Sequence, residues 1–225
     1  MRTLYHYPLC PYSRKIRLIL AEKKLDFTAE IERFWEKRAD YIRLNPSGQV
    51  PTLVDLNGSV IADSMAISEY LEDAYPERPL IGEGLIQRAE VRRLVGWFDG
   101  KFAQEVSVNL LMEKSIKRHL PSEAGAGPNS AAIRNAKVAI NQHLEYISWL
   151  VDRRNWLAGD DFSLADITAS AHLSVVDYMG DVLWDKHPVA KDWYARIKSR
   201  PSFRSFFQDR VPGLTPAPHY ADLDF

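Results

Sequence analysis

The first 75 residues alternate short apolar runs with amphipathic segments. Their pattern predicts strands at residues 3–7, 26–31, 51–55 and 59–61, and helices at residues 11–24, 38–44 and 64–75. The Asn-Pro-Ser-Gly run at 45–48 ends the second helix, and the Asn-Gly pair at 57–58 predicts a hairpin between the last two strands. The predicted order of elements is therefore β-α-β-α-β-β-α.

Beyond residue 87 every long periodic segment is helical. Apolar residues recur every three or four positions over residues 87–120 and 130–153, and residues 164–179 are largely apolar. Gly96 and Gly100 are expected to weaken the first of these helices locally, and shorter helices are expected at 190–199 and 201–208. Residues 121–129 are expected to form a loop.

Proline and glycine cluster at residues 77–85, which marks a domain boundary. We predict an α/β domain at residues 1–77, a linker at 78–86, an all-α domain at 87–210 and an extended acidic tail at 211–225.

Composition narrows the possible functions. Hydrophobic residues make up 46% of the chain and charged residues 26%, which fits a globular protein and excludes disorder throughout. The formal charge of −1 argues against a protein whose main task is to grip nucleic acid through its phosphates. No stretch approaches the ~18 apolar residues of a membrane span, and the N-terminus lacks the apolar core of a signal peptide. We therefore expect a cytoplasmic protein without membrane insertion.

The single cysteine, Cys10, is the first candidate for chemistry. One cysteine excludes an internal disulfide framework and a Cys-rich zinc site, and the histidines show no spacing that suggests a metal site. Cys10 stands where the first strand meets the first helix, and the free N–H groups of a helix start can lower the pKa of a thiol. Ser13 follows in a C-x-x-S arrangement, so thiol chemistry at Cys10 would need an external thiol. Alternatively, Cys10 is a small buried packing residue.

Two further motifs fit recognition of a small peptide. Val50 and Pro51 open the third strand, and a cis bond between them would turn the backbone N–H and C=O of Val50 outward. Proline at a strand start can also be merely structural. Asp63 and Ser64 open a helix, where they either cap it or present its free N–H groups to a ligand carboxylate.

Together these motifs resemble the glutathione transferase superfamily over residues 1–208. The matching pieces are the turn at 10–13, the segment 45–53, the helix start at 63–67 and the segment 161–167. Within the last piece, Ser163 and Asp166 predict a structural capping box. The resemblance implies a thioredoxin-like N-terminal domain with a four-stranded sheet and a cis Val50–Pro51 bond at its edge, followed by an all-α domain.

The same resemblance implies a glutathione site. Val50 would pair with the cysteinyl unit, Asp63 and Ser64 would hold the γ-glutamyl end, and Gln49 would help at the peptide. The implied glutathione-binding residues are Tyr12, Gln49, Val50, Pro51, Asp63 and Ser64. The implied catalytic residues, at the ligand thiol, are Cys10 and Ser13.

Two roles in that site stay open at this point. Tyr5 or Tyr7 could replace Cys10 and Ser13 at the ligand thiol, as tyrosine does in other classes of the superfamily. Lys37 or Arg14 could supply the cation that the glycyl carboxylate needs.

The C-terminal end is the second informative feature. Residues 212–225 carry three prolines and no lysine or arginine, so they cannot form a core helix. Acidic and apolar residues alternate at their end, which fits an extended docking peptide, although such a tail can also pack on its own domain. The expected partner-binding residues are His219, Tyr220, Asp222, Leu223, Asp224 and Phe225.

The tail and residues 174–181 are similar to one bacterial subgroup of the superfamily. Its members bind FtsZ filaments and support constriction, so the resemblance implies a homodimer with FtsZ filaments as partner. Because the helix at 201–208 is expected to close the all-α domain, we expect deletion after Pro212 to leave the fold intact.

Two functions follow. The first is an FtsZ-binding division scaffold that acts without catalysis. The second is a glutathione-dependent enzyme, a transferase or thiol transferase, in which the pKa of Cys10 would lie well below the ordinary value for cysteine.

Overall fold

The computed structural model describes residues 1–120 and 127–223. Its N-terminal part contains the strands β1 (Arg2–His6), β2 (Phe27–Ile31), β3 (Thr52–Val54) and β4 (Val60–Ala62). They form one sheet in the order β2-β1-β3-β4, with β1 parallel to β2 and antiparallel to β3, and β3 antiparallel to β4. The predicted four-stranded sheet is confirmed.

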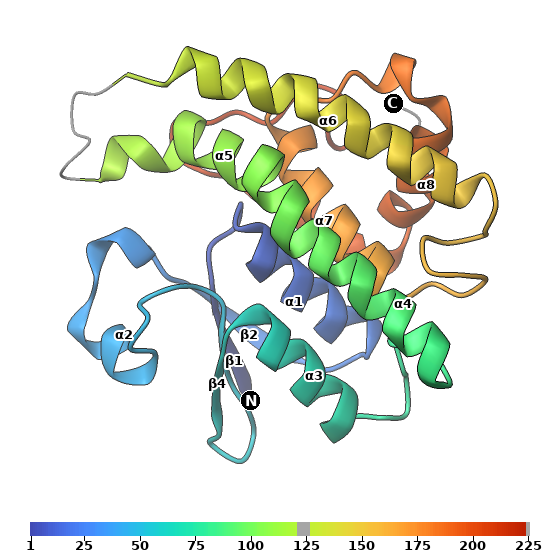
Figure 1. The fold of residues 1–225 in the computed structure, drawn as a ribbon. Helices are drawn as coiled ribbons and strands as arrows, with labels where there is room; N and C mark the ends of the chain where they lie inside the picture. Colours follow the sequence, from blue (N-terminus) through green and yellow to red (C-terminus); the bar gives the residue numbers. More distant parts are fainter. Residues whose placement is uncertain (121–126, 224–225) are drawn as a thin grey trace.

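Helices cover both faces of this sheet. α1 (Pro11–Glu22) and α3 (Ser64–Ala74) lie on the face toward the C-terminal helices, whereas α2 (Ala39–Leu44) lies on the other side (Figure 1). The Val50–Pro51 peptide bond is cis, as predicted. The strand that it precedes, β3, is an inner strand, so the bond lies at the end of the sheet rather than along its outer edge.

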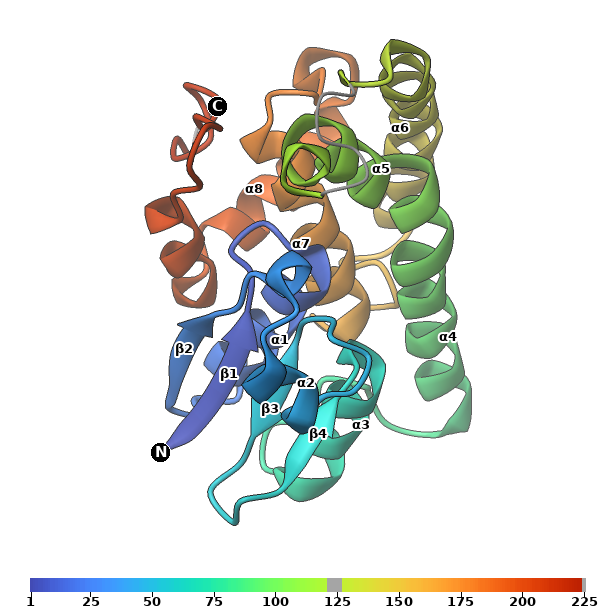
Figure 2. The ribbon, with the colours of Figure 1, turned by 90° about the vertical axis from the view of Figure 1, so that its left-hand side faces the viewer.

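The C-terminal part is helical, as Figure 2 shows from a second side. Its helices include α6 (Ser130–Val151), α7 (Leu164–Tyr178) and α8 (Pro188–Lys198), and 3-10 turns span Trp184–Lys186 and Pro201–Gln208. Every residue of α7 is buried, as its apolar sequence predicts. Ser163 and Asp166 form the expected capping box at its start.

The segment predicted as one helix over residues 87–120 is helical up to His119 but changes its hydrogen-bonding register. It consists of α4 (Leu85–Gly96), a π-helix over Trp97–Ser107, α5 (Val108–Leu111), a second π-helical stretch over Met112–Ile116 and a 3-10 turn over Lys117–His119. The wide π register begins directly after Gly96, one of the two glycines expected to weaken the helix. π-helical stretches are rare and occur often at functional sites.

One apolar core joins the two parts of the molecule. Leu4 and Ile16 of the N-terminal part pack in the same buried cluster as Phe98, Leu144 and other residues of the helical part. The division into domains at residue 77 stays a prediction. Among the described residues, no helix is both long and apolar enough to cross a membrane.

The tail packs on its own helical domain over residues 211–222, where Lys198 of α8 donates to the carbonyl of Asp222 at 2.6 Å. Ala217 N donates to the carbonyl of Tyr178 at 2.9 Å, and Tyr220 is 1% exposed. The expectation that the 201–208 segment already closes the domain is therefore wrong, because Tyr220 belongs to the core. Asp224 and Phe225 lie outside the described residues.

Candidate functional site

A cavity of about 620 Å³ opens between the N-terminal domain and the π-helix. All six residues expected to bind glutathione line it: Tyr12, Gln49, Val50, Pro51, Asp63 and Ser64. The structure thus brings together three sequence motifs that are far apart along the chain. Sequence reasoning missed five other lining residues, namely Asn45, Ser47, Ala62, Met65 and Asp99.

The loop before Pro51 is shaped by Asn45. Its side-chain nitrogen donates to the carbonyl of Gln49 at 2.8 Å, and its side-chain oxygen accepts from both the backbone and the hydroxyl of Ser47. The hydroxyl of Tyr41 donates to the same Gln49 carbonyl. No hydrogen bond joins the N–H of Val50 to another described residue, so this donor is available to a ligand, as the cis geometry predicts.

Asp63 and Ser64 begin α3 at the other side of the cavity. Asp63 is the N-cap residue, and its Oδ1 accepts from the N–H groups of Met65 and Ala66 at 2.7 and 3.2 Å. Its φ of 76° is rare for a residue with a side chain and indicates a backbone held by its surroundings. Capping and ligand binding are compatible here, because the second carboxylate oxygen of Asp63 takes no part in the cap.

Asp99, in the π-helix, is the lining residue that the helical domain contributes. No local sequence motif around Asp99 predicts this role. Its carboxylate lies 2.5 Å from Lys15 Nζ and 3.0 Å from His172 Nε2, while its backbone carbonyl accepts from the hydroxyl of Tyr12 at 2.9 Å. Burial opposes ionisation of Asp99, but Lys15 and His172 outweigh it and lower the pKa of the carboxyl. Asp99 is therefore ionised and forms an ion pair with the buried Lys15 at the cavity wall.

The tyrosine in the turn is not an activated phenol. Burial, and then the charge of Asp99, raises the pKa of Tyr12 to about 12. Burial also raises the pKa of Tyr7, which does not line this cavity. Both phenols are neutral at physiological pH, so neither is prepared to deprotonate a ligand thiol.

Cys10 lies beside the main cavity rather than in its lining. It contributes to a smaller apolar cavity of about 120 Å³ that shares Tyr12, Gln49 and Val50 with the larger one. Cys10 as a residue is 8% exposed, and its sulfur lies 3.9 Å from the carbonyl oxygen of Val50. Burial raises the pKa of Cys10, opposed by hydrogen bonds from Ser13 and Tyr12. The expectation of a thiolate well below the ordinary pKa is wrong, because loss of hydration outweighs the helix start.

Ser13, the other expected catalytic residue, is fully buried. Its hydroxyl oxygen accepts from the backbone N–H of Tyr7 at 3.3 Å, and it lines neither cavity. This placement fits a residue that holds the strand-to-helix turn.

Alkylation of Cys10 by iodoacetamide is expected to be slow. Its rate is expected to reach half of the maximum only above about pH 8.5, which is the ordinary pKa of a free cysteine thiol. The cause is burial of the sulfur, which disfavours the thiolate. The alkylation rate is measured against pH in the native protein and in the urea-unfolded protein, and the pH of the half-maximal rate is compared between the two. The signal comes from Cys10 alone, because the chain has no other cysteine. A native half-maximal point below that of the unfolded chain would contradict this account.

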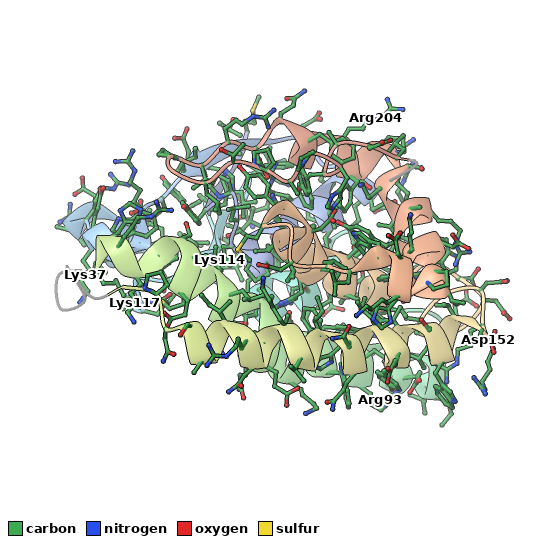
Figure 3. The ribbon with its side chains drawn as sticks, turned by 90° about the horizontal axis from the view of Figure 1, so that it is seen from above. Lys37, Arg93, Lys114, Lys117, Asp152 and Arg204 are labelled. Atoms are coloured by element: carbon green, nitrogen blue, oxygen red, sulfur yellow. The ribbon has the colours of Figure 1, made fainter. Side chains whose placement is uncertain are left out.

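Neither cation proposed for the glycyl carboxylate reaches the cavity. Arg14 is fully buried and bonds the Pro8 carbonyl, Ser174, Tyr220 and Asp209. Lys37 is exposed and lies at the periphery of the molecule (Figure 3). The prediction that Arg14 could hold the ligand is wrong, because it is the centre of a buried network. The described lining of the cavity contains two carboxylates and no lysine or arginine.

The tail residues expected to bind a partner have separate environments. Tyr220 is buried, His219 Nε2 lies 2.9 Å from Asp177 Oδ1, and the carbonyl of Asp222 accepts from Lys198 at 2.6 Å. Leu223 is 42% exposed. Of the expected partner-binding residues that the structure describes, Asp222 and Leu223 are exposed, whereas Tyr220 is buried and does not face a partner.

Comparison with known families identifies the class. The glutathione S-transferase N-terminal domain family matches residues 9–74, and the glutathione S-transferase C-terminal domain family matches residues 112–201. The chain belongs to the glutathione S-transferase superfamily. The fold class expected from the sequence is confirmed.

Individual relatives fall into two groups. FtsZ-localized protein A of Caulobacter vibrioides is 49% identical over 100% of this chain and 98% of its own length. The solved structure of FzlA from C. crescentus matches with a TM-score of 0.94 and 48% identity, covering 100% of this chain and 99% of that one. A glutathione S-transferase structure from Rhodospirillum rubrum F11 matches with a TM-score of 0.95 and 52% identity over the full length of both chains.

Proposed function

We propose that this protein is an FtsZ-binding component of the bacterial division machinery that acts as a scaffold on a transferase fold. The observation that carries the proposal is the 49% identity over the whole chain to a protein named for its localisation with FtsZ. The match covers 100% of this chain and therefore includes the tail. The proposal places the protein in the cytoplasm, where FtsZ filaments assemble.

The chemistry of the site supports a scaffold over a catalyst. Glutathione carries two carboxylates and one ammonium group, whereas the charged residues in the described lining are Asp63 and Asp99, the latter paired with the buried Lys15, and no lysine or arginine lines the cavity to hold the carboxylates. Its thiol would meet no activated group, because burial raises the pKa of both Cys10 and Tyr12. A catalytic site needs groups that stabilise developing negative charge. The described lining supplies no lysine or arginine for this purpose, and the N–H of Val50 is the unpaired backbone donor identified there.

A glutathione-dependent enzyme is the second candidate. The observation in its favour is the cavity itself, with the unpaired N–H of Val50 and the start of α3 on facing walls. Calorimetric titration with glutathione distinguishes the scaffold from the glutathione-dependent enzyme. The scaffold proposal expects no saturation in the low millimolar range, and saturation with turnover of an electrophile would favour the enzyme.

A homodimer is part of the proposal. Leu56 and Val60 are 62% and 43% exposed and lie in the connection between β3 and β4 and at the start of the edge strand β4. Exposed apolar side chains grouped at a sheet edge are typical of association surfaces. Light scattering is expected to give twice the 25.8 kDa of one chain.

The function is tested by co-sedimentation. Wild-type protein is expected in the pellet with FtsZ filaments and in the supernatant with unassembled FtsZ. Recovery in the supernatant under both conditions would contradict the proposal.

A further inference from the structure

A second cavity, of about 420 Å³, lies apart from the transferase site and shares no lining residue with it. Three segments that are distant in the sequence form it: the end of β1, the connection from β2 to α2, and residues 210–212 at the start of the tail, with His119 completing the wall. Nothing in the proposed function uses this cavity.

Its floor and one wall are aromatic and apolar. Tyr7, Pro8 and Val211 are buried, and the ring of Trp35 meets that of Tyr7 edge-on with 5.1 Å between centroids. The ring of His119 stacks on that of Trp35, with 4.8 Å between the ring centroids and 10° between the ring planes. Trp35 is thus held in place by packing, which makes the wall a rigid surface for an apolar side chain.

The rim is positively charged. Arg33 and Arg210 are exposed and line the opening together with one acidic residue, Glu36, to which Arg33 bonds at 3.2 Å. Arg210 uses one guanidinium nitrogen for the carbonyls of Phe207 and Asp209. Its remaining N–H groups make no hydrogen bond to any residue in the described ranges, so they are open to a carboxylate.

The adjoining strand favours an extended ligand. β2 is an edge strand that pairs only with β1 in the described sheet, and four of its five residues are exposed. Its last residue, Ile31, is 61% exposed and lines the cavity. The unpaired backbone groups of an edge strand can bind a peptide that adds as a further strand. A peptide running along β2 would enter the cavity at its end.

We propose that the 420 Å³ cavity and the edge of β2 bind an extended segment of a partner protein in which aspartate or glutamate alternates with leucine or phenylalanine. Alternation places the apolar side chains on one face, toward Trp35, Tyr7 and Val211, and the carboxylates on the other. The rim arginines then pair with the carboxylates, and the backbone of the segment pairs with β2. This recognition does not depend on FtsZ or on glutathione.

The probe is a fluorescein-labelled seven-residue peptide of alternating aspartates and apolar residues, one of them phenylalanine. Fluorescence anisotropy is expected to show saturable binding to the full chain. The double variant R33E/R210E is expected to weaken binding at least tenfold, and the variant W35A at least fivefold. Hydrogen exchange is expected to show new protection over residues 27–36 when the peptide is bound.

Matched controls separate this site from general attraction. The variant R43E/R204E makes the same charge change at two exposed arginines outside the cavity, the second of which is labelled in Figure 3, and it should bind within twofold of wild type. A peptide with asparagine for each aspartate should bind at least tenfold more weakly. Thermal melting confirms that each variant is folded. Failure of the acidic probe to bind wild type, or equal loss in the two double variants, would overturn the proposal.

Discussion

Replacement of Asp209 by asparagine is expected to lower the free energy of unfolding by about 3–5 kcal/mol, the usual cost of removing one partner of a buried ion pair. The carboxylate of Asp209 bonds Arg14 at 3.0 Å, and both of its oxygens bond Arg17 at 2.9 and 3.0 Å. Arg14 is fully buried, so the variant leaves its charge without a counter-ion. This network connects α1 to the segment before the tail.

Urea denaturation measures the change. The matched control is Asp152→Asn, at a side chain that is 69% exposed (Figure 3) and that should shift the free energy of unfolding by less than about 0.5 kcal/mol. A loss below about 1 kcal/mol in Asp209→Asn would show that Arg14 and Arg17 find other partners.

Replacement of Tyr220 by alanine is expected to cost about 3–5 kcal/mol, as for other large aromatic residues removed from a core. The ring packs on Tyr178 and Phe207, with centroids at 5.1 and 6.0 Å, and the hydroxyl accepts from Arg14 at 3.0 Å. Deletion after Pro212 removes this contact entirely, so the truncated protein should be less stable still. The sequence-based expectation of an intact fold is thereby reversed.

Two further variants resolve the contributions of the tail. Tyr220→Phe keeps the ring and removes the acceptor of Arg14, so it should cost about 1–3 kcal/mol. Leu223→Ala, at a side chain 42% exposed, should leave the melting temperature within a degree or two of wild type. A fully stable Tyr220→Ala protein would show that the tail does not belong to the core.

Six residues that line the 620 Å³ cavity could be predicted from the sequence because they act through local backbone geometry. A cis proline, a helix start and a strand-to-helix turn are each encoded within a few adjacent residues. The cis bond at Val50–Pro51 and the cap by Asp63 accordingly have the expected geometry.

What the sequence could not reveal depends on contacts between distant segments. Arg14 has the spacing of a surface residue on α1, yet Asp209 and Tyr220, about 200 positions away, bury its charge. Cys10 stands at a helix start as expected, but packing around it sets its pKa. Asp99 enters the cavity because the π register begins just before it, which no apolar periodicity signals.

Co-sedimentation of FtsZ filaments with wild-type protein and with Cys10→Ala, side by side, tests the central claim most directly. The scaffold account predicts that both proteins pellet with the filaments to the same extent, because the thiol is a buried packing residue 8% exposed. A wild-type protein that stays in the supernatant while the filaments pellet would contradict the claim. So would a folded Cys10→Ala protein that no longer binds, since binding would then depend on the thiol.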